Sequence, residues 1–151
     1  MDLEGIFRAH QREIFVYFLR TIGDRERAED LAQETFLRAC GSAVLYRGTA
    51  SVRTWLFSIA RNTLVDSYRR RSPELLGDPP DQVVEFDPVR RLEVEEALRA
   101  LPILSREAIV LCDVLELSPS DAANVAGISA NAFRVRLHRA RDQFRKVFDH
   151  E

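Results

Sequence analysis

The feature that most constrains this chain is a capping signal, a glycine and a second capping signal that follow one another within a few residues. Ser118 suits the N-cap of a helix, Pro119 suits its first position, and Asp121 can reach back as in a capping box. Gly127 follows a short apolar run, where it suits a tight turn. Ser129 can then cap another helix. The pattern therefore predicts two helices joined by a short glycine turn.

The second of these helices has two different faces. One face carries an apolar stripe that would pack the domain: Phe133, Leu137, Ala140, Phe144, Val147 and Phe148. The opposite face holds residues placed to meet base edges near the helix start, which are Asn131, Arg134, Val135, His138 and Arg139, with Arg141 and Arg145 better placed for phosphates. Helix, glycine turn and basic helix predict a helix-turn-helix.

The basic face has a second interpretation, because arginines on a helix often form an ordinary solvated surface. The preceding short helix and glycine turn favour contact with DNA. His138 by itself is as consistent with an exposed side chain of no function as with a DNA contact.

Elsewhere every long apolar period is helical, and no alternating run is long enough to predict a sheet. The remaining predicted helices run from Leu3 to Arg20 with Gly23 as the stop, from an Asp24 cap to Cys40, from a Thr49 or Ser51 cap to Arg71, from Val89 to Leu101 before Pro102, and from a Ser105 cap to Leu117. The fold class is therefore all-α.

A change of composition divides the chain of 151 residues into two small helical domains. Residues 72–88 combine several prolines with acidic side chains and predict a flexible acidic linker between domains 1–71 and 89–151. The formal net charge of −2 hides a segregation, because residues 72–98 carry eight acids against two bases, whereas residues 129–147 carry six bases against one acid. A basic DNA-binding helix is compatible with an acidic protein.

Several classes of function find no support in the sequence. It contains no glycine-rich phosphate loop, no metal-ligand cluster and no nucleophile beside a base, so we expect neither an enzyme nor a cofactor, metal or small-molecule substrate. No apolar run reaches the roughly 20 residues of a membrane span, and the N-terminus lacks a secretion signal, so we expect a cytoplasmic protein without membrane insertion. Cys40 and Cys112 are expected to be buried reduced thiols, with a redox switch as the lesser alternative.

Two sets of motifs resemble the extracytoplasmic-function sigma factors of the sigma-70 family. The segment from Ala28 to Ala39 (AEDLAQETFLRA), the segment from Trp55 to Asn62 (WLFSIARN) and the basic run at residues 69–71 are similar to their domain two. The segments ALRALP at residues 97–102, REA at 106–108 and RLHRAR at 136–141 are similar to their domain four. The resemblance covers nearly the whole chain except the linker, and it implies two sigma domains.

The resemblance also implies a protein partner, RNA polymerase core enzyme. In this family the second helix of domain two docks on a coiled coil of the largest polymerase subunit, which would place Asp30, Gln33, Glu34 and Leu37 in the contact. A merely solvated acidic face is the alternative.

The resemblance further implies promoter DNA as a partner. The loop and third helix of domain two would hold the single-stranded minus-ten element through Tyr46, Arg47, Arg61, Asn62, Arg69, Arg70 and Arg71. Trp55 lies on the apolar stripe and is expected to be structural. Asp66 either contacts the DNA region or pairs within its helix with Arg69 and Arg70, and the pair is slightly favoured.

Domain four would bind the minus-thirty-five element as duplex, through the exposed face of the predicted recognition helix. Ala132 and Phe133 depart from the residues that the family often has there, so a promoter sequence cannot be carried over. The family also implies an inhibitory anti-sigma factor, which could hold the protein at the membrane. The main alternative is a helix-turn-helix regulator that binds duplex DNA without polymerase, but it leaves the domain-two motifs unexplained.

Overall fold

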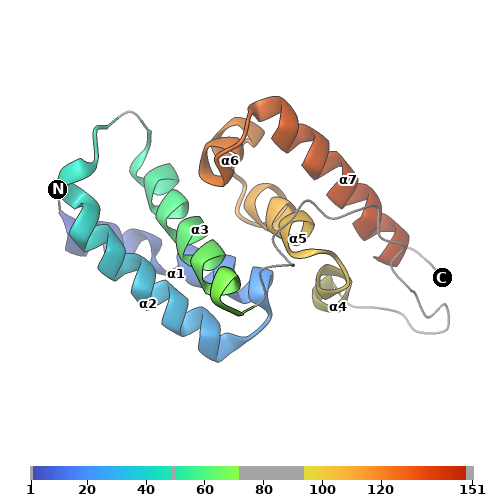
Figure 1. Ribbon diagram of the computed structural model, residues 1–151, viewed down its shortest axis with the longest axis horizontal. Helices are drawn as coiled ribbons and strands as arrows, with labels where there is room; N and C mark the ends of the chain where they lie inside the picture. The colour runs from blue at the N-terminus through green and yellow to red at the C-terminus, as the bar shows by residue number, and fades with distance from the viewer. Residues whose placement is uncertain (1, 49, 72–93, 149–151) are drawn as a thin grey trace.

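The computed structural model describes residues 2–48, 50–71 and 94–148, and the predicted linker at 72–88 lies outside them. The N-terminal half consists of α1 (Leu3–Ile22), α2 (Arg25–Ser42), the 3-10 turn η1 (Ala43–Leu45) and α3 (Val52–Arg71). The C-terminal half consists of α4 (Val94–Arg99), α5 (Ile103–Ile109), the π-helical turn η3 (Val110–Val114), α6 (Pro119–Ala126) and α7 (Ala130–Phe148). The described residues contain no strand, and the all-α prediction is confirmed (Figure 1).

The N-terminal helices begin where the sequence indicated, but α1 and α2 each end two residues after the predicted Arg20 and Cys40. Gly23 adopts a left-handed φ of 81°, and its N–H donates to the Leu19 carbonyl, which closes α1. The Asp24 side chain accepts a hydrogen bond from the Arg27 N–H at 3.2 Å and caps α2. Of the two predicted caps of α3, Ser51 acts as the cap, accepting from the Thr54 N–H at 3.0 Å.

The predicted turn between the last two helices is also present. The Ser118 hydroxyl accepts from the Asp121 N–H at 3.0 Å, and Pro119 is the first residue of α6. Gly127 has a φ of 70°, a conformation that side chains with a Cβ rarely adopt. The Ser129 hydroxyl accepts from the Ala132 N–H at 3.1 Å and caps α7. Local hydrogen bonding thus sets the geometry of the helix-turn-helix.

Replacing Ser118 by alanine should lower the free energy of unfolding by about 1 kcal/mol, because the Asp121 N–H would lose its acceptor. Thermal unfolding followed by circular dichroism measures the loss, as a fall in Tm of about 2–4 °C. Ser120→Ala, an exposed serine in the same turn, is the matched control and should leave Tm nearly unchanged. Equal falls for both variants would argue against the cap.

The helix preceding this motif differs from its prediction. Ser105 was expected to cap a helix ending at Leu117, but Pro102 occupies the N-cap position of α5, and Ser105 is buried inside the helix. The helix then widens into η3, where the Leu115 N–H donates to the Val110 carbonyl five residues earlier. Such π-turns accommodate an extra residue in a helix, which a regular apolar period does not signal. The predicted start at Val89 lies outside the described residues.

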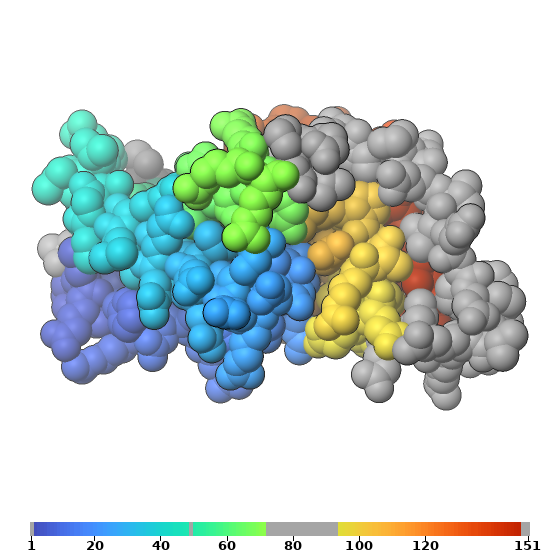
Figure 2. Space-filling model, turned by 60° about the horizontal axis from the view of Figure 1, so that its bottom comes forward, coloured from blue at the N-terminus to red at the C-terminus, as the bar shows by residue number. Residues whose placement is uncertain are grey.

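The two halves of the chain pack directly against each other. In Figure 1, α3 faces α6 across the middle of the molecule, and Figure 2 shows the surface of the N-terminal half meeting that of α4. The first helix also contacts α5 and η3. Buried apolar side chains from both halves form one continuous cluster. The described residues are therefore held together by a shared core.

The apolar stripe of α7 is buried or half-buried with one exception. Phe133, Leu137, Ala140 and Val147 are buried, and Phe144 packs against the cluster from a half-buried position. The prediction for Phe148 is wrong, since it is exposed in the last turn and stacks on Phe144 with ring centroids 5.4 Å apart.

Candidate functional site

The predicted DNA-binding residues of α7 are exposed, and His138, Arg141 and Arg145 among them border a pocket with residues of α4 and α5. Every residue predicted to contact duplex DNA is exposed: Asn131, Arg134, Val135, His138, Arg139, Arg141 and Arg145. Burial of the apolar stripe fixes this orientation, because residues on the other side of the helix must then point to solvent. The arrangement presents several cations from one rigid element, as binding to a duplex groove and its phosphates requires.

Arg141 differs from the other predicted DNA contacts because its guanidinium is paired with a carboxylate of the protein. Its Nε and Nη2 donate to the two oxygens of Asp113 in η3, at 3.0 and 2.7 Å. These hydrogen bonds raise the pKa of Arg141 above its usual value. The paired geometry ties α7 to the π-turn, so Arg141 also has a structural contact that the sequence did not indicate.

The predicted polymerase-binding residues lie along one side of α2. Asp30 and Gln33 are exposed, and Leu37 keeps 73% of its surface in solvent. Glu34 is half-buried and pairs with Arg38, with Nη2 and Oε1 2.8 Å apart. An exposed leucine flanked by acids and an amide is suited to a protein partner that carries basic side chains.

Arg38 also corrects the expectation for Asp66. The carboxylate of Asp66 accepts from Arg38 Nη1 at 2.8 Å, so it pairs between α2 and α3 instead of within its own helix. The Arg70 Nε donates to the main-chain carbonyl of Asp66 at 3.3 Å. Packing of α2 on α3 brings the Arg38 guanidinium to the Asp66 carboxylate, although Arg69 and Arg70 are nearer to Asp66 in the sequence.

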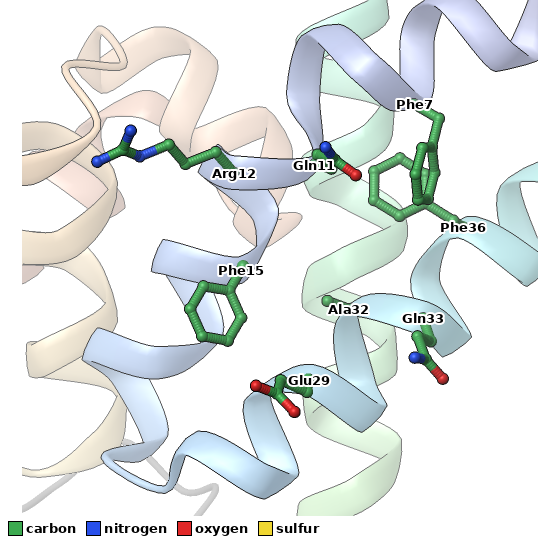
Figure 3. A pocket seen from close by; sticks show the side chains of 8 residues that line it. All are labelled: Phe7, Gln11, Arg12, Phe15, Glu29, Ala32, Gln33 and Phe36. Atoms are coloured by element: carbon green, nitrogen blue, oxygen red, sulfur yellow. The ribbon is translucent and has the colours of Figure 1, made fainter.

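A groove of about 410 Å³ runs between α1 and α2 beside this acidic surface. Figure 3 shows the rings of Phe7, Phe15 and Phe36 along it, with Gln33 at its edge. Phe7 meets Phe36 edge to face, with ring centroids 4.3 Å apart. The groove extends the α2 surface with apolar area.

The loop before α3 is held by its own aromatic residues. The Tyr46 hydroxyl donates to the Ala50 carbonyl at 2.5 Å, and its ring centroid lies 5.1 Å from that of Trp55. Trp55 is half-buried and packs against the core, in keeping with its expected structural role. Arg47 is exposed, as are four of the other six predicted contacts, Asn62, Arg69, Arg70 and Arg71. These side chains are accessible to a nucleic-acid strand.

Arg61 is placed differently from the other predicted minus-ten residues. Only 16% of its side chain is exposed, because it points from α3 into the contact between the two halves. Its Nε lies 3.4 Å from Glu107 Oε2, and its Nη1 donates to the Ala126 carbonyl at 3.3 Å. The same Glu107 oxygen accepts from the Tyr17 hydroxyl at 2.5 Å. A DNA contact by Arg61 requires these bonds to break.

Sequence reasoning missed Glu107 and Tyr17 entirely. Glu107 is only 1% exposed, and Tyr17 is fully buried. Burial, and next the charge and hydrogen bond of Glu107, raise the pKa of Tyr17 well above its usual value. The phenol therefore stays protonated and donates to the carboxylate. A glutamate in a helix of mixed polarity carries no local signal that it is buried.

Other polar bonds cross the same contact. Arg53 lies between Glu13, with Nη2 and Oε1 3.0 Å apart, and the Leu115 carbonyl, which accepts from Nη2 at 2.5 Å. Burial acts to raise the pKa of Glu13, but the hydrogen bonds and charges of Arg53 and His10 outweigh it and lower that pKa. The Arg106 guanidinium donates to the Thr21 carbonyl at 2.6 Å.

The cysteines contradict the expectation of two buried thiols. Cys40 is exposed, whereas Cys112 is half-buried. Burial, followed by the charge of Asp113, raises the pKa of Cys112 to about 11, which keeps this thiol protonated near neutral pH. Among the residues that the structure describes, no group of three or more potential ligands could hold a metal ion. None of the described helices is long and apolar enough to cross a membrane.

Comparisons with known proteins agree with the two halves of the fold. Residues 6–74 match the family Sigma-70 region 2, and residues 91–144 match Sigma-70 region 4. The chain is 37% identical over 150 residues to the ECF RNA polymerase sigma factor SigC of Mycobacterium tuberculosis, covering 93% of this chain and 80% of that protein. It is 30% identical to the ECF RNA polymerase sigma factor SigM of Bacillus subtilis, covering 99% of this chain and 96% of that protein.

Solved structures show the same arrangement of helices. CnrH, solved in complex with the cytosolic domain of CnrY, is similar with a TM-score of 0.73 and 28% identity, over 97% of this chain and 87% of that chain. The fold also matches the sigma factor RpoE of Bartonella quintana, in complex with the anti-sigma factor NepR, with a TM-score of 0.77 and 23% identity, over 96% of this chain and 95% of that one.

These matches decide between the two functions that the sequence left open. A helix-turn-helix regulator that acts without polymerase is not favoured, because the N-terminal half matches a sigma-factor region of its own. The similarity to SigC and SigM extends over both halves of the fold. The chain belongs to the extracytoplasmic-function family of RNA polymerase sigma factors.

Proposed function

We propose that this sigma factor divides its work between the two halves of the fold. The acidic side of α2, with Asp30, Gln33, Glu34 and Leu37, binds the core polymerase. The exposed face of α7 reads the minus-thirty-five element as duplex DNA. The observation that carries this proposal is that α2 and α7 expose surfaces of opposite charge on separate halves.

The loop before α3 and α3 itself bind the minus-ten element. Arg47 and the basic end of α3 supply cations for the phosphates of a separated strand, and Asn62 offers an amide to a base edge. Tyr46 supplies an aromatic surface for stacking of a base once its ring contact with Trp55 is broken. Arg61 joins this surface when the two halves separate.

We further propose that this sigma factor is not an enzyme and that an inhibitory partner controls it. The protein acts without catalysing a reaction and works in the cytoplasm. An anti-sigma factor holds it inactive by covering the polymerase-binding surface, and a membrane-bound inhibitor would retain it at the membrane. The domains extend over residues 1–71 and 89–151, with 72–88 as the linker. The similarity to the sigma factor RpoE, which was solved in complex with the anti-sigma factor NepR, supports the inhibitory partner.

Run-off transcription tests the function directly. Core polymerase is incubated with the full chain and a broad set of genomic promoter fragments. We expect transcripts with defined start sites that require both core enzyme and this protein. Core-dependent transcripts from none of the fragments would refute the proposal, as would tight, specific duplex binding by the protein without core enzyme.

Leu37 provides the sharpest single test of the α2 surface. Leu37→Ala should weaken binding to core polymerase about tenfold, because burying an exposed leucine contributes roughly 1.5–3 kcal/mol and alanine keeps part of that. Fluorescence anisotropy with labelled protein measures the affinity. Glu26→Ala, exposed in the first turn of the same helix but outside the proposed surface, is the control. Equal affinities for the two variants would remove Leu37 from the contact.

A further inference from the structure

We propose that Glu107 competes with promoter DNA for Arg61. Glu107 holds Arg61 in the contact between the two halves until a nucleic-acid strand replaces Glu107 as the partner of Arg61. The inference rests on the proposed minus-ten role of Arg61. It assigns a function to two residues, Glu107 and Tyr17, that lie in neither proposed DNA-binding surface.

The bonding around Glu107 is the first support. One carboxylate oxygen accepts from the Tyr17 hydroxyl of α1 and lies opposite the Arg61 guanidinium of α3, so α5 is joined to two helices of the other half through a single group. A carboxylate that is 1% exposed is unfavourable unless it is paired and hydrogen-bonded. Glu107 therefore favours the packed arrangement in which both partners are present.

The chemistry of Arg61 is the second support. A guanidinium binds carboxylate and phosphate with the same planar donors, and the Arg61 Nε and Nη1 that are bonded in the packed arrangement are not available to a phosphate. In the packed arrangement Arg61 bonds to Glu107 and to the Ala126 carbonyl of α6, with little of its surface left for solvent. Its neighbour Asn62 is exposed on the same helix, so packing hides one of two adjacent predicted contacts.

Other bonds across the same boundary link the Glu107–Arg61 bond to the packing of the two halves. Arg53 donates to the Leu115 carbonyl and Arg106 to the Thr21 carbonyl, each across the same boundary, and Arg20 pairs with Glu95 there. These bonds lie around the Glu107 contact, and α3 packs on α6 beside it. Separating the halves therefore releases Arg61 as part of one event.

The part of the affinity for single-stranded DNA that Arg61 contributes follows from the fraction of open molecules, because only they present Arg61. Glu107→Gln keeps the size of the side chain and removes its charge, and Tyr17→Phe removes only the hydroxyl. We expect either change in the full chain to tighten binding of a labelled, randomised single strand of about 16 nucleotides by about tenfold. Small-angle X-ray scattering should show a larger radius of gyration for both variants.

Asp142→Asn is the matched control, since Asp142 pairs with Lys146 inside α7 and away from the boundary. It should change neither DNA affinity nor radius. Adding Arg61→Ala to Glu107→Gln should abolish the gain in affinity and keep the expansion. If Glu107→Gln loses helical circular dichroism and so does not fold, the DNA affinity and radius of gyration of Tyr17→Phe test the proposal instead. Wild-type radii, or expansion without tighter DNA binding, would overturn the inference.

Run-off transcription by the wild-type protein distinguishes failure of Glu107 as an internal competitor from failure of the proposed sigma function. Transcripts from wild type together with unchanged Glu107 and Tyr17 variants would reject the internal competitor and leave the sigma function standing. Absence of any core-dependent transcript would reject the proposed function itself.

Discussion

Replacing Phe133 by alanine should lower the free energy of unfolding by about 3–5 kcal/mol, as expected for the loss of a fully buried aromatic side chain. Phe133 is fully buried one turn into α7, where it anchors the predicted recognition helix to the core. Removing the ring forfeits its transfer free energy and leaves a cavity that the surrounding helices fill only in part. Urea unfolding followed by circular dichroism gives the value.

Phe148→Ala is the comparison for this prediction. Phe148 lies in the last turn of the same helix but is exposed, so its truncation should cost about 1 kcal/mol or less. A similar loss for both variants would mean that α7 is not held by the burial of Phe133. A large loss at Phe133 alone would also explain a loss of promoter activity without any change in DNA contacts, so stability must be measured beside transcription.

The second large effect is expected on the recognition face. Arg134→Ala and Arg139→Ala should each weaken transcription from a responsive promoter by about 5- to 150-fold, because a lost bidentate base contact costs about 1–3 kcal/mol. Both side chains are exposed, so their removal leaves the core of α7 intact. Run-off transcription by the reconstituted holoenzyme, at fixed salt, measures the effect.

The pattern across promoters distinguishes two kinds of contact. An arginine that reads a base should lower activity most where the minus-thirty-five sequence is optimal, whereas an arginine on phosphate should weaken all promoters alike and reduce the salt slope by about 1. Arg8→Ala, an exposed arginine of α1 that pairs with Glu4, serves as the control. Unchanged transcription by both α7 variants would show that this face does not bind the promoter.

Much of the fold could be predicted from local sequence. Asp24, Ser51, Ser118 and Ser129 cap helices through hydrogen bonds to N–H groups three residues away, and Gly23 takes a left-handed conformation. These interactions act over one helical turn, so the chain encodes them without reference to the rest of the molecule. The orientation of α7 follows in the same way, since its apolar period alone selects the buried face.

The tertiary structure decided what depends on segments far apart in the chain. The partner of Asp66 is Arg38 on another helix, and Arg61 is drawn from a predicted DNA surface into a contact with Glu107, 46 residues away. Long side chains choose among several nearby charges, and packing sets which of them is closest. The sequence by itself determined most of the helices, the caps Asp24, Ser51, Ser118 and Ser129, and the exposed side of α7. The burial of Glu107 and Arg61 came from the packing of two halves, because a pairing across such distances leaves no periodic trace in the chain.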